Sequence, residues 1–435
     1  MKVTIIGAGS AVFAAELIKD ILLIDGLNEG TFGLVDIDSK RLKLTEDFAR
    51  FIIKKTGKNF KLEVSEERKE ILPGSDYVIN TIEVYGPQNV EKEYDIPMKY
   101  GVDQCIGDTI GPGGLFKALR TLPTWLDIVD DIMRICPKAL VMNYTNPMSL
   151  TVLAAIRATK GKIRIVGLCH SIQETSKVLA EYLDIPYREL DWRAAGINHM
   201  AWFIKLADRQ GNDLYPILKE KIKDESFRKK DPVRFHLMEN FGAFMTESSG
   251  HVSEYLPFIR KRQDIIDKYT GPSYLGESGF YKNMWPTERE NASKDLKEMM
   301  EPDFELERGE EFASYIIEAE FFNKPTVIHG NVLNRGMIEN LPHDGVVEVA
   351  CLIDDKGVQP VYFGTLPTHM ALYNIQHMSF HDLVVESVLT KDREKAFHAL
   401  MIDPLTSAVC SLDEIRAMFE EMVAAEKGYL PDYLY

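Results

Sequence analysis

Short apolar runs alternate with longer amphipathic stretches through about the first 170 residues of the chain. The amphipathic stretches predict a helix that ends near Ile24, a helix capped by Ser39, and a long helix over Leu115–Ile135. The short runs are rich in β-branched residues and predict buried strands at Lys2–Ile6, Thr31–Val35, Asp76–Ile82, Ala139–Met142 and Ile163–Leu168. This β-α-β order predicts a doubly wound, Rossmann-like parallel sheet with helices on both faces.

The pattern changes after about Asp191. Trp192–Leu206 predicts an apolar strand pair or bend, and Asp208–Asp213 predicts a polar turn of the hairpin kind. Charged helical segments follow, then a second hairpin with Asp354–Gly357 at its turn, flanked by strands at Gly345–Leu352 and Gln359–Phe363. The chain after about Pro367 is predicted to be helical. We expect two domains, the Rossmann-like one over 1–191 and a mixed α+β domain over 192–435, which suits a chain of 435 residues.

Charge and cysteine content narrow the function classes. A net charge of −16 argues against a nucleic-acid partner, since such surfaces gather lysine and arginine. No run of about 18 apolar residues occurs, so we expect no membrane partner. The N-terminal apolar run is only about one strand long, which predicts no secretory signal. The five cysteines are odd in number and far apart, which favours a reducing compartment; we expect a cytoplasmic protein.

A glycine-rich turn follows the first predicted strand. Gly7 permits the tight turn, and Gly9 lets the backbone approach a pyrophosphate at the start of a helix, next to Ser10. Val12 stands where the third glycine of the dinucleotide fingerprint belongs. The turn therefore predicts a dinucleotide site at Gly7, Gly9 and Ser10, with a plain tight turn in another kind of α/β domain as the alternative.

An acidic residue ends the second predicted strand. Asp36 is suitably placed to accept a hydrogen bond from a ribose 2′-hydroxyl, and its charge would repel a 2′-phosphate. We therefore predict NAD rather than NADP. Asp38 is a rival for this role, although its position suits the entry of the next helix better.

Four short strings have an unusual composition with residues that carry chemistry, and most follow predicted strand ends, where open α/β sheets bind ligands. They are Gly107–Gly114 (GDTIGPGG), Asn143–Pro147 (NYTNP), Gly167–Ser171 (GLCHS) and Gly196–Ala201 (GINHMA). Cys169 and His199 offer a thiolate and an imidazole to a divalent metal and leave positions open for substrate oxygens. A buried core thiol and a core histidine are the alternatives for these two residues.

These strings, the GAGS start and the Ser253–Pro257 (SEYLP) segment occur in this order in glycoside hydrolase family 4, which the chain resembles from Met1 to the 360s and more loosely beyond. The resemblance implies a fold like that of lactate and malate dehydrogenases. It also implies NAD at Gly7, Gly9 and Asp36, and a divalent metal, usually Mn²⁺, held by Cys169 and His199.

Residues after the cysteine vary with substrate in this family. Cys169-His170-Ser171 resembles the α-galactosidase, or melibiase-like, branch, and so does Ala195–Trp202. Uronic-acid-specific members also carry Cys-His, while α-glucosidases tend to have aspartate there and 6-phospho-glycosidases asparagine. The resemblance implies an α-galactosidase acting on a small α-glycoside, with α-glucuronidase, α-galacturonidase and α-glucosidase as alternatives.

The resemblance also implies a mechanism other than a carboxylate pair. NAD takes hydride from carbon 3 of the sugar, a base removes the proton on carbon 2, the aglycone leaves carbon 1, and water and hydride then add back. Tyr255 matches the position of the base, with Glu254 as the neighbouring alternative and Arg260 and Arg262 downstream to lower the pKa of the phenol. His170 matches the acid that protonates the leaving group, or else binds substrate.

Further polar residues are expected to bind the sugar. Asn146 matches a residue that holds hydroxyl groups, and Asp108 stands where relatives often have the longer glutamate. Asn143 is a second candidate, with capping of the strand–helix turn as its alternative, and Arg260 is a third. We also expect a homo-oligomer, a dimer or tetramer. From other classes, a 2-hydroxy-acid dehydrogenase and a non-catalytic NAD sensor remain as alternatives.

Overall fold

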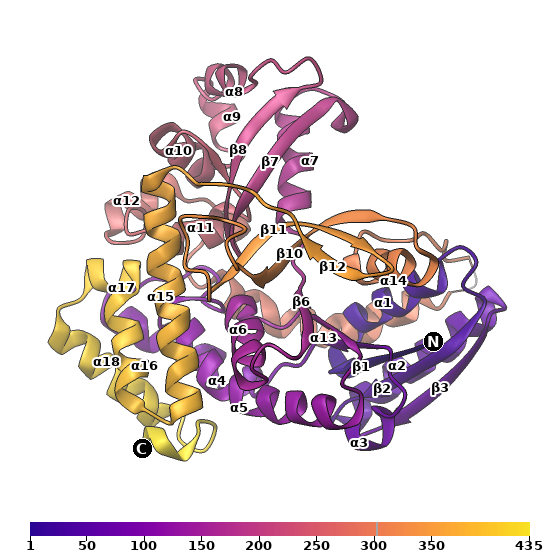
Figure 1. The fold of residues 1–435 in the computed structure, drawn as a ribbon. Coiled ribbons are helices and arrows are strands. Elements are labelled where there is room, and N and C mark those ends of the chain that lie inside the picture. Colours follow the sequence, from indigo (N-terminus) through magenta and orange to yellow (C-terminus); the bar gives the residue numbers. More distant parts are fainter. Residues whose placement is uncertain (302) are drawn as a thin grey trace.

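The computed structural model describes residues 1–301 and 303–435, and its centre is one continuous sheet (Figure 1). The strand order is β3-β2-β1-β4-β5-β6-β10-β11-β7-β8-β9, with β12 paired to β11. The strands are β1 (Lys2–Ile6), β2 (Glu29–Val35), β3 (Asn59–Ser65), β4 (Tyr77–Asn80), β5 (Leu140–Asn143), β6 (Arg164–Gly167), β7 (Leu190–Ile197), β8 (Met200–Asp208), β9 (Phe244–Met245), β10 (Thr326–Leu333), β11 (Val346–Asp354) and β12 (Gly357–Pro360).

Helices pack on both faces of the parallel part of this sheet. Neighbouring strand residues such as Val78 and Ile79 belong to two different apolar cores, because successive side chains point to opposite faces. The helices are α1 (Val12–Leu22), α2 (Ser39–Thr56), α3 (Arg68–Ile71), α4 (Gly86–Lys99), α5 (Gly111–Ile135), α6 (Met148–Ala158), α7 (Ser171–Leu183), α8 (Tyr215–Lys221), α9 (Glu225–Arg228), α10 (Pro232–Phe241), α11 (Ser249–Tyr255), α12 (Gln263–Tyr269), α13 (Phe280–Met299), α14 (Phe312–Phe322), α15 (Thr368–Thr390), α16 (Arg393–Ile402), α17 (Pro404–Val409) and α18 (Leu412–Ala425).

The predicted doubly wound parallel sheet is confirmed. Strands β3-β2-β1-β4-β5-β6 are all parallel, and the predicted strands and the long helix α5 occur with small shifts at their ends. The edge strand β3 was not predicted. The cap of α2 was assigned wrongly: the side chain of Asp38, not Ser39, accepts hydrogen bonds from the N–H groups of Lys40 and Arg41. The preference for Asp38 as a helix-entry residue is thereby confirmed.

Strands from the second half of the chain extend the same sheet. The predicted strand pair is the hairpin β7–β8, and the second predicted hairpin is β11–β12. The predicted polar turn at Asp208 also forms: an isolated antiparallel bridge between Ala207 and Asp213 closes it before α8 begins. The unpredicted strand β10 joins the halves: Asn331 pairs with Gly167 at the end of β6.

The C-terminal helices α15 to α18 confirm the predicted helical end of the chain, and α15 packs against α5 and α6. Within the described residues, no helix combines the length and apolar character needed to cross a membrane.

Candidate functional site

The glycine turn joins β1 to α1 through a short 3₁₀ turn at Ala8–Ser10. Gly7 has φ of 90°, and a Cβ there would lie 2.6 Å from the carbonyl carbon of Thr81. The amino end of α1, which begins at Val12, has no side-chain cap. Its free N–H groups and the helix dipole suit a pyrophosphate, so this turn fits the predicted dinucleotide.

Asp36 lies against the glycine turn. Its Oδ2 accepts a hydrogen bond from the N–H of Gly9 at 2.7 Å, and its Oδ1 accepts one from the N–H of Asp38 at 2.8 Å. A Cβ on Gly9 would come within 2.6 Å of this carboxylate, so Gly9 is required by the packing of Asp36 as well as by any cofactor. Arg41 donates from Nε to the carbonyl oxygen of Gly9 at 2.6 Å, which places a cation beside the turn. Ser10 Oγ lies 3.5 Å from Thr81 Oγ1.

Cys169 and His199 come together, as the metal hypothesis requires. Cys169 follows β6, and His199 lies in the turn between β7 and β8. A third residue, Glu247, joins them, and one potential ligand atom from each lies within 4.8 Å of the others. Sequence reasoning missed Glu247 because it stands some fifty residues from His199 and carries no recognisable motif.

The charges of the cluster suit a cation. Burial and the nearby carboxylates of Glu247 and Glu348 raise the pKa of the Cys169 thiol to about 12. Burial would also raise the pKa of Glu247, but the histidines around it, His251 first, lower it below its ordinary value. A divalent cation would convert the thiol to the thiolate that binds metals.

Two buried polar side chains beside the cluster have no hydrogen-bond partner among the described residues. Glu348, on β11, has no exposed surface, and neither of its carboxylate oxygens receives a hydrogen bond. The side-chain amide of Asn198 is also buried, with neither atom paired. Buried polar groups are nearly always satisfied, so these orphans indicate that a bound group completes the site. The donor set therefore fits a divalent metal with a polyhydroxylated ligand.

Tyr255 lies at the end of α11 with its hydroxyl 3.4 Å from Nδ1 of His199. The residue is buried, and its backbone carbonyl accepts a hydrogen bond from Nε2 of His377 at 2.7 Å. Burial, together with the charges of Asp108 and Glu254, raises the pKa of the phenol well above its ordinary value. A basic role for Tyr255 consequently needs positive charge near its oxygen, and the adjacent cluster is where a cation fits.

Glu254, the alternative base, is occupied by the backbone. Its carboxylate accepts hydrogen bonds from the N–H groups of Cys105 and Gly107, both at 2.9 Å, and of Ile106 at 3.3 Å. Burial raises the pKa of Glu254 to about 7. These contacts hold the loop that leads to Asp108, so the geometry favours Tyr255 over Glu254 as a base.

His170 is half-exposed directly after Cys169. Its Nδ1 lies 3.3 Å from Oε1 of Glu311, and this contact is the largest cause that raises the pKa of His170, to about 10. His170 lines a pocket of about 490 Å³ with residues of α1, α7 and α14. A protonated His170 beside open space suits either predicted role.

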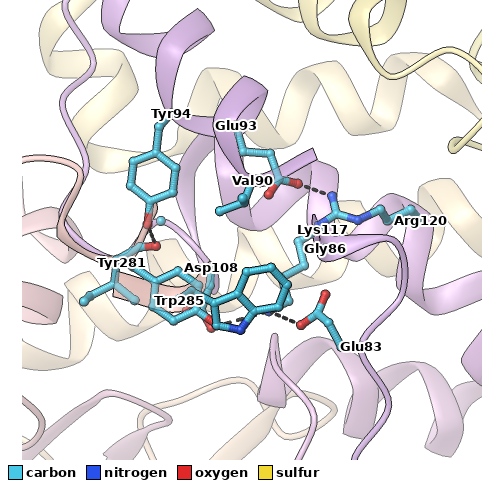
Figure 2. Close-up of a pocket in the computed structure, with 12 residues that line it drawn as sticks. Glu83, Gly86, Val90, Glu93, Tyr94, Asp108, Lys117, Arg120, Tyr281 and Trp285 are labelled. Carbon is cyan, nitrogen blue, oxygen red and sulfur yellow. Dashed lines mark hydrogen bonds and ion pairs between the residues drawn. The ribbon is translucent and has the colours of Figure 1, made fainter. Parts of the chain in front are cut away.

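Asn146 and Asp108 meet across the site, with Nδ2 of Asn146 donating to Oδ2 of Asp108 at 3.1 Å. Asp108 lies in a second, small pocket in which Lys117 Nζ is 3.6 Å from Oδ2 of Asp108 and 3.0 Å from Oε2 of Glu83 (Figure 2). Burial, the largest single effect, would raise the pKa of Asp108, but Lys117, His251 and Thr109 together lower it below its ordinary value. Lys117 and Glu83 were not predicted.

Two expected sugar ligands are fully engaged elsewhere. Asn143 is buried, accepts from Asn80 at 2.7 Å and donates to Thr145 and Thr151, which supports its alternative role in holding the strand–helix turn. Arg260 has no exposed surface, and all five of its N–H groups donate hydrogen bonds. Two go to Asp103 and one each to Ser253, Gly276 and Ser278. The substrate-binding assignments of Asn143 and Arg260 are therefore corrected.

This arrangement matches known proteins along almost the whole chain. Residues 2–185 match the model of family 4 glycosyl hydrolases, and residues 194–406 match the model of the family 4 C-terminal domain. The chain belongs to glycoside hydrolase family 4. An α-galactosidase of Bacillus subtilis is 39% identical, with 99% of each chain covered, and one of Rhizobium meliloti is 35% identical, covering 100% of this chain and 90% of its own.

Solved structures of family 4 enzymes share this fold. A 6-phospho-α-glucosidase from gut microorganisms, in complex with NAD and Mn²⁺, has a TM-score of 0.83 at 21% identity, and 99% of each chain is covered. The 6-phospho-β-glucosidase of Thermotoga maritima with manganese, NAD⁺ and glucose-6-phosphate has a TM-score of 0.80 at 21% identity, also over 99% of each chain. Malate dehydrogenase of Plasmodium falciparum has a TM-score of 0.52 at 12% identity, covering 92% of this chain and 99% of its own, which supports the expected dehydrogenase-like fold.

Proposed function

We propose that this family 4 glycosidase is an α-galactosidase that requires NAD and a divalent metal, with Mn²⁺ the expected ion. The observation that carries the proposal is the convergence of Cys169 and His199 on the sheet edge that also holds the glycine turn. Family 4 relatives with this fold are solved with NAD and Mn²⁺, and two relatives named α-galactosidase match nearly the full length.

The charge next to Asp108 supports a neutral sugar. Lys117 lies between the carboxylates of Glu83 and Asp108, so these three groups together carry one net negative charge. A free cation there would suit the carboxylate of a uronic acid or a phosphate group, whereas paired charges suit hydroxyl groups. This distinction favours galactose over galacturonic acid or a 6-phospho-sugar.

Each side chain then has a defined task. When bound, NAD supplies hydride transfer at carbon 3 and the metal polarises the oxygens on carbons 2 and 3. Tyr255 accepts the proton of carbon 2, and His170 donates a proton to the oxygen of the leaving group. Asp108 accepts and Asn146 donates hydrogen bonds that orient the sugar.

A panel of p-nitrophenyl α- and β-glycosides, assayed with NAD, Mn²⁺ and dithiothreitol, tests the proposal. We expect release from the α-galactoside, with loss of activity when NAD or the metal is omitted and no net NADH formed. Stoichiometric NADH with a 2-hydroxy acid would instead identify a dehydrogenase, and preference for a uronide or glucoside would overturn the sugar assignment. Cofactor and metal binding without sugar release from any glycoside would identify a sensor.

We further propose that the enzyme works in the cytoplasm as a homo-oligomer, either a dimer or a tetramer. All five cysteines are free, which suits a reducing compartment. Large apolar side chains are exposed near the junction of α14 and β10, with Phe321 at 50% and Val327 at 58%, and such surface supports association. Light scattering coupled to gel filtration measures the mass; a monomer at micromolar concentration would contradict the oligomer.

A further inference from the structure

The position of Glu247 is fixed by pairing between two strands. β9 lies antiparallel to β8, with Met245 opposite Trp202. Beyond it, the N–H of Thr246 donates to the carbonyl oxygen of Ala201 at 2.9 Å, and the N–H of Ala201 donates to Oγ1 of Thr246 at 3.1 Å. This double contact locks Glu247 next to the turn that carries His199.

Both residues leave their strands in an uncommon backbone conformation. His199 has φ of 62° and Glu247 has φ of 69°, a region that residues other than glycine seldom adopt. The result is that an imidazole nitrogen and a carboxylate oxygen come within 4.8 Å of each other and of the Cys169 sulfur. Glutamate is not among the residues enriched in this region, so at position 247 the chain keeps a carboxylate where glycine or asparagine would suit the backbone better.

We propose that Glu247 is a third protein ligand of the divalent metal, in addition to Cys169 and His199. The inference rests on the proposed function, because the metal itself is part of that proposal. Sulfur, nitrogen and oxygen donors together suit a first-row divalent ion, and the hard carboxylate in particular suits Mn²⁺. Thiolate and carboxylate also bring two negative charges, which balance the two positive charges of the ion in this partly buried cluster.

A purely structural role for Glu247 accounts for less of the geometry. Its Oε1 lies 3.1 Å from Nδ1 of His251, the same nitrogen that lies 3.2 Å from Oγ of Ser248, so His251 already has a local partner. An ion pair between Glu247 and His251 also leaves both carboxylate oxygens of the buried Glu348 without a hydrogen-bond partner among the described residues. A cation held by Cys169, His199 and Glu247 supplies the positive charge that this neighbouring carboxylate lacks.

Direct measurement of Mn²⁺ binding tests the proposal without relying on turnover. The full-length protein is stripped with chelator under dithiothreitol and titrated with Mn²⁺ in the absence of sugar, with free Mn²⁺ read from its electron paramagnetic resonance signal. We expect Glu247→Gln to weaken Mn²⁺ binding by at least about 100-fold, since even partners outside the metal's own ligands contribute about 10- to 100-fold. Glu247→Asp, which keeps a shorter carboxylate, should fall between wild type and Glu247→Gln.

Two further variants separate the possible roles. His251→Asn removes the other partner of Glu247 and keeps its carboxylate; we expect Mn²⁺ affinity within a few-fold of wild type. Glu174→Gln, which removes an exposed carboxylate on α7 beside His170, is the matched control and should leave the affinity unchanged. Circular dichroism and thermal melting establish that each variant is folded.

The outcomes are distinct. Mn²⁺ affinity of Glu247→Gln within threefold of wild type, with Cys169→Ser strongly weakened, would overturn the third ligand and leave the proposed function standing. Equal loss in His251→Asn and Glu247→Gln would also overturn it, because Glu247 would then act through His251. Unchanged affinity in Cys169→Ser would instead contradict the metal site of the proposed function.

Discussion

Replacing Arg260 with leucine separates a residue that holds the fold from one that touches substrate. Arg260 is completely buried, and its guanidinium lies 2.8 Å from Oδ2 of Asp103. Removing one partner of a buried ion pair costs about 3–5 kcal/mol, because the other charge stays buried and uncompensated. We therefore expect Arg260→Leu to be substantially less stable than wild type while its site residues remain unchanged.

The magnitude can be expressed as a melting temperature. Unfolding entropies of about 2.1 cal/mol/K per residue give about 0.9 kcal/mol/K for the 435 residues, so the loss corresponds to a Tm lowered by about 3–6 °C. Differential scanning fluorimetry measures the shift, and assays at a temperature well below Tm measure KM. We expect the Tm to fall and the KM for the glycoside to change less than twofold.

The chain provides a matched control two residues away. Arg262 is exposed and, among the described residues, forms its ion pair with its neighbour Asp264, at 2.9 Å, so Arg262→Leu should leave the Tm unchanged. The double variant Asp103→Leu with Arg260→Leu should be more stable than Arg260→Leu alone, since no unpaired charge remains. A wild-type Tm together with a strongly raised KM in Arg260→Leu would refute this reasoning and restore Arg260 as a substrate ligand.

Three further outcomes follow from the site. Cys169→Ala should lose glycosidase activity, and full activity of this variant would exclude the metal assignment. Thiol-blocking reagents should inactivate wild type, and Mn²⁺ bound beforehand should prevent this inactivation. Asp36→Ala should weaken NAD binding and strengthen NADP binding, because Arg41 remains beside the glycine turn. Tighter binding of NADP than of NAD to wild type, measured by isothermal titration calorimetry, would contradict the role of Asp36. Burial raises the pKa of Glu254 in the folded state, so this group contributes stability that is present below about pH 4.5 and lost as the pH rises through about 7. Urea unfolding should therefore show the stability of wild type falling relative to Glu254→Gln over that pH range. Parallel stability profiles of the two proteins would refute the raised pKa.

The parallel half of the fold was predictable because its strands carry a strong local signal. Buried parallel strands such as β4 and β5 are continuous apolar runs, and a turn rich in glycine marks the start of α1. The sequence did not predict β3 and β10, for two different reasons. β3 is an edge strand with polar residues, and the apolar content of β10 is interrupted by His329, Gly330 and Asn331, whose place in the sheet depends on pairing with strands remote in sequence.

The motif residues of the site were predictable from the sequence, whereas the residues that contact them were less so. Cys169, His199 and Tyr255 lie together as the motifs implied. Glu247 joins them only because β9 pairs with β8, and a two-residue strand has no sequence signal. Arg260 was misassigned because a sequence shows that an arginine is present but not that all five of its donors are already used within the fold.

In the proposed mechanism the glycosidic bond breaks by oxidation and elimination, and hydrolysis in D₂O distinguishes this route from direct displacement. Removal of the proton on carbon 2 by Tyr255 exchanges that hydrogen with solvent before water adds back. We expect galactose that carries deuterium at carbon 2, detected by NMR, and Tyr255→Phe should lose most of kcat with little change in KM. Galactose released without deuterium at carbon 2, by enzyme stripped of NAD, would exclude oxidation and elimination.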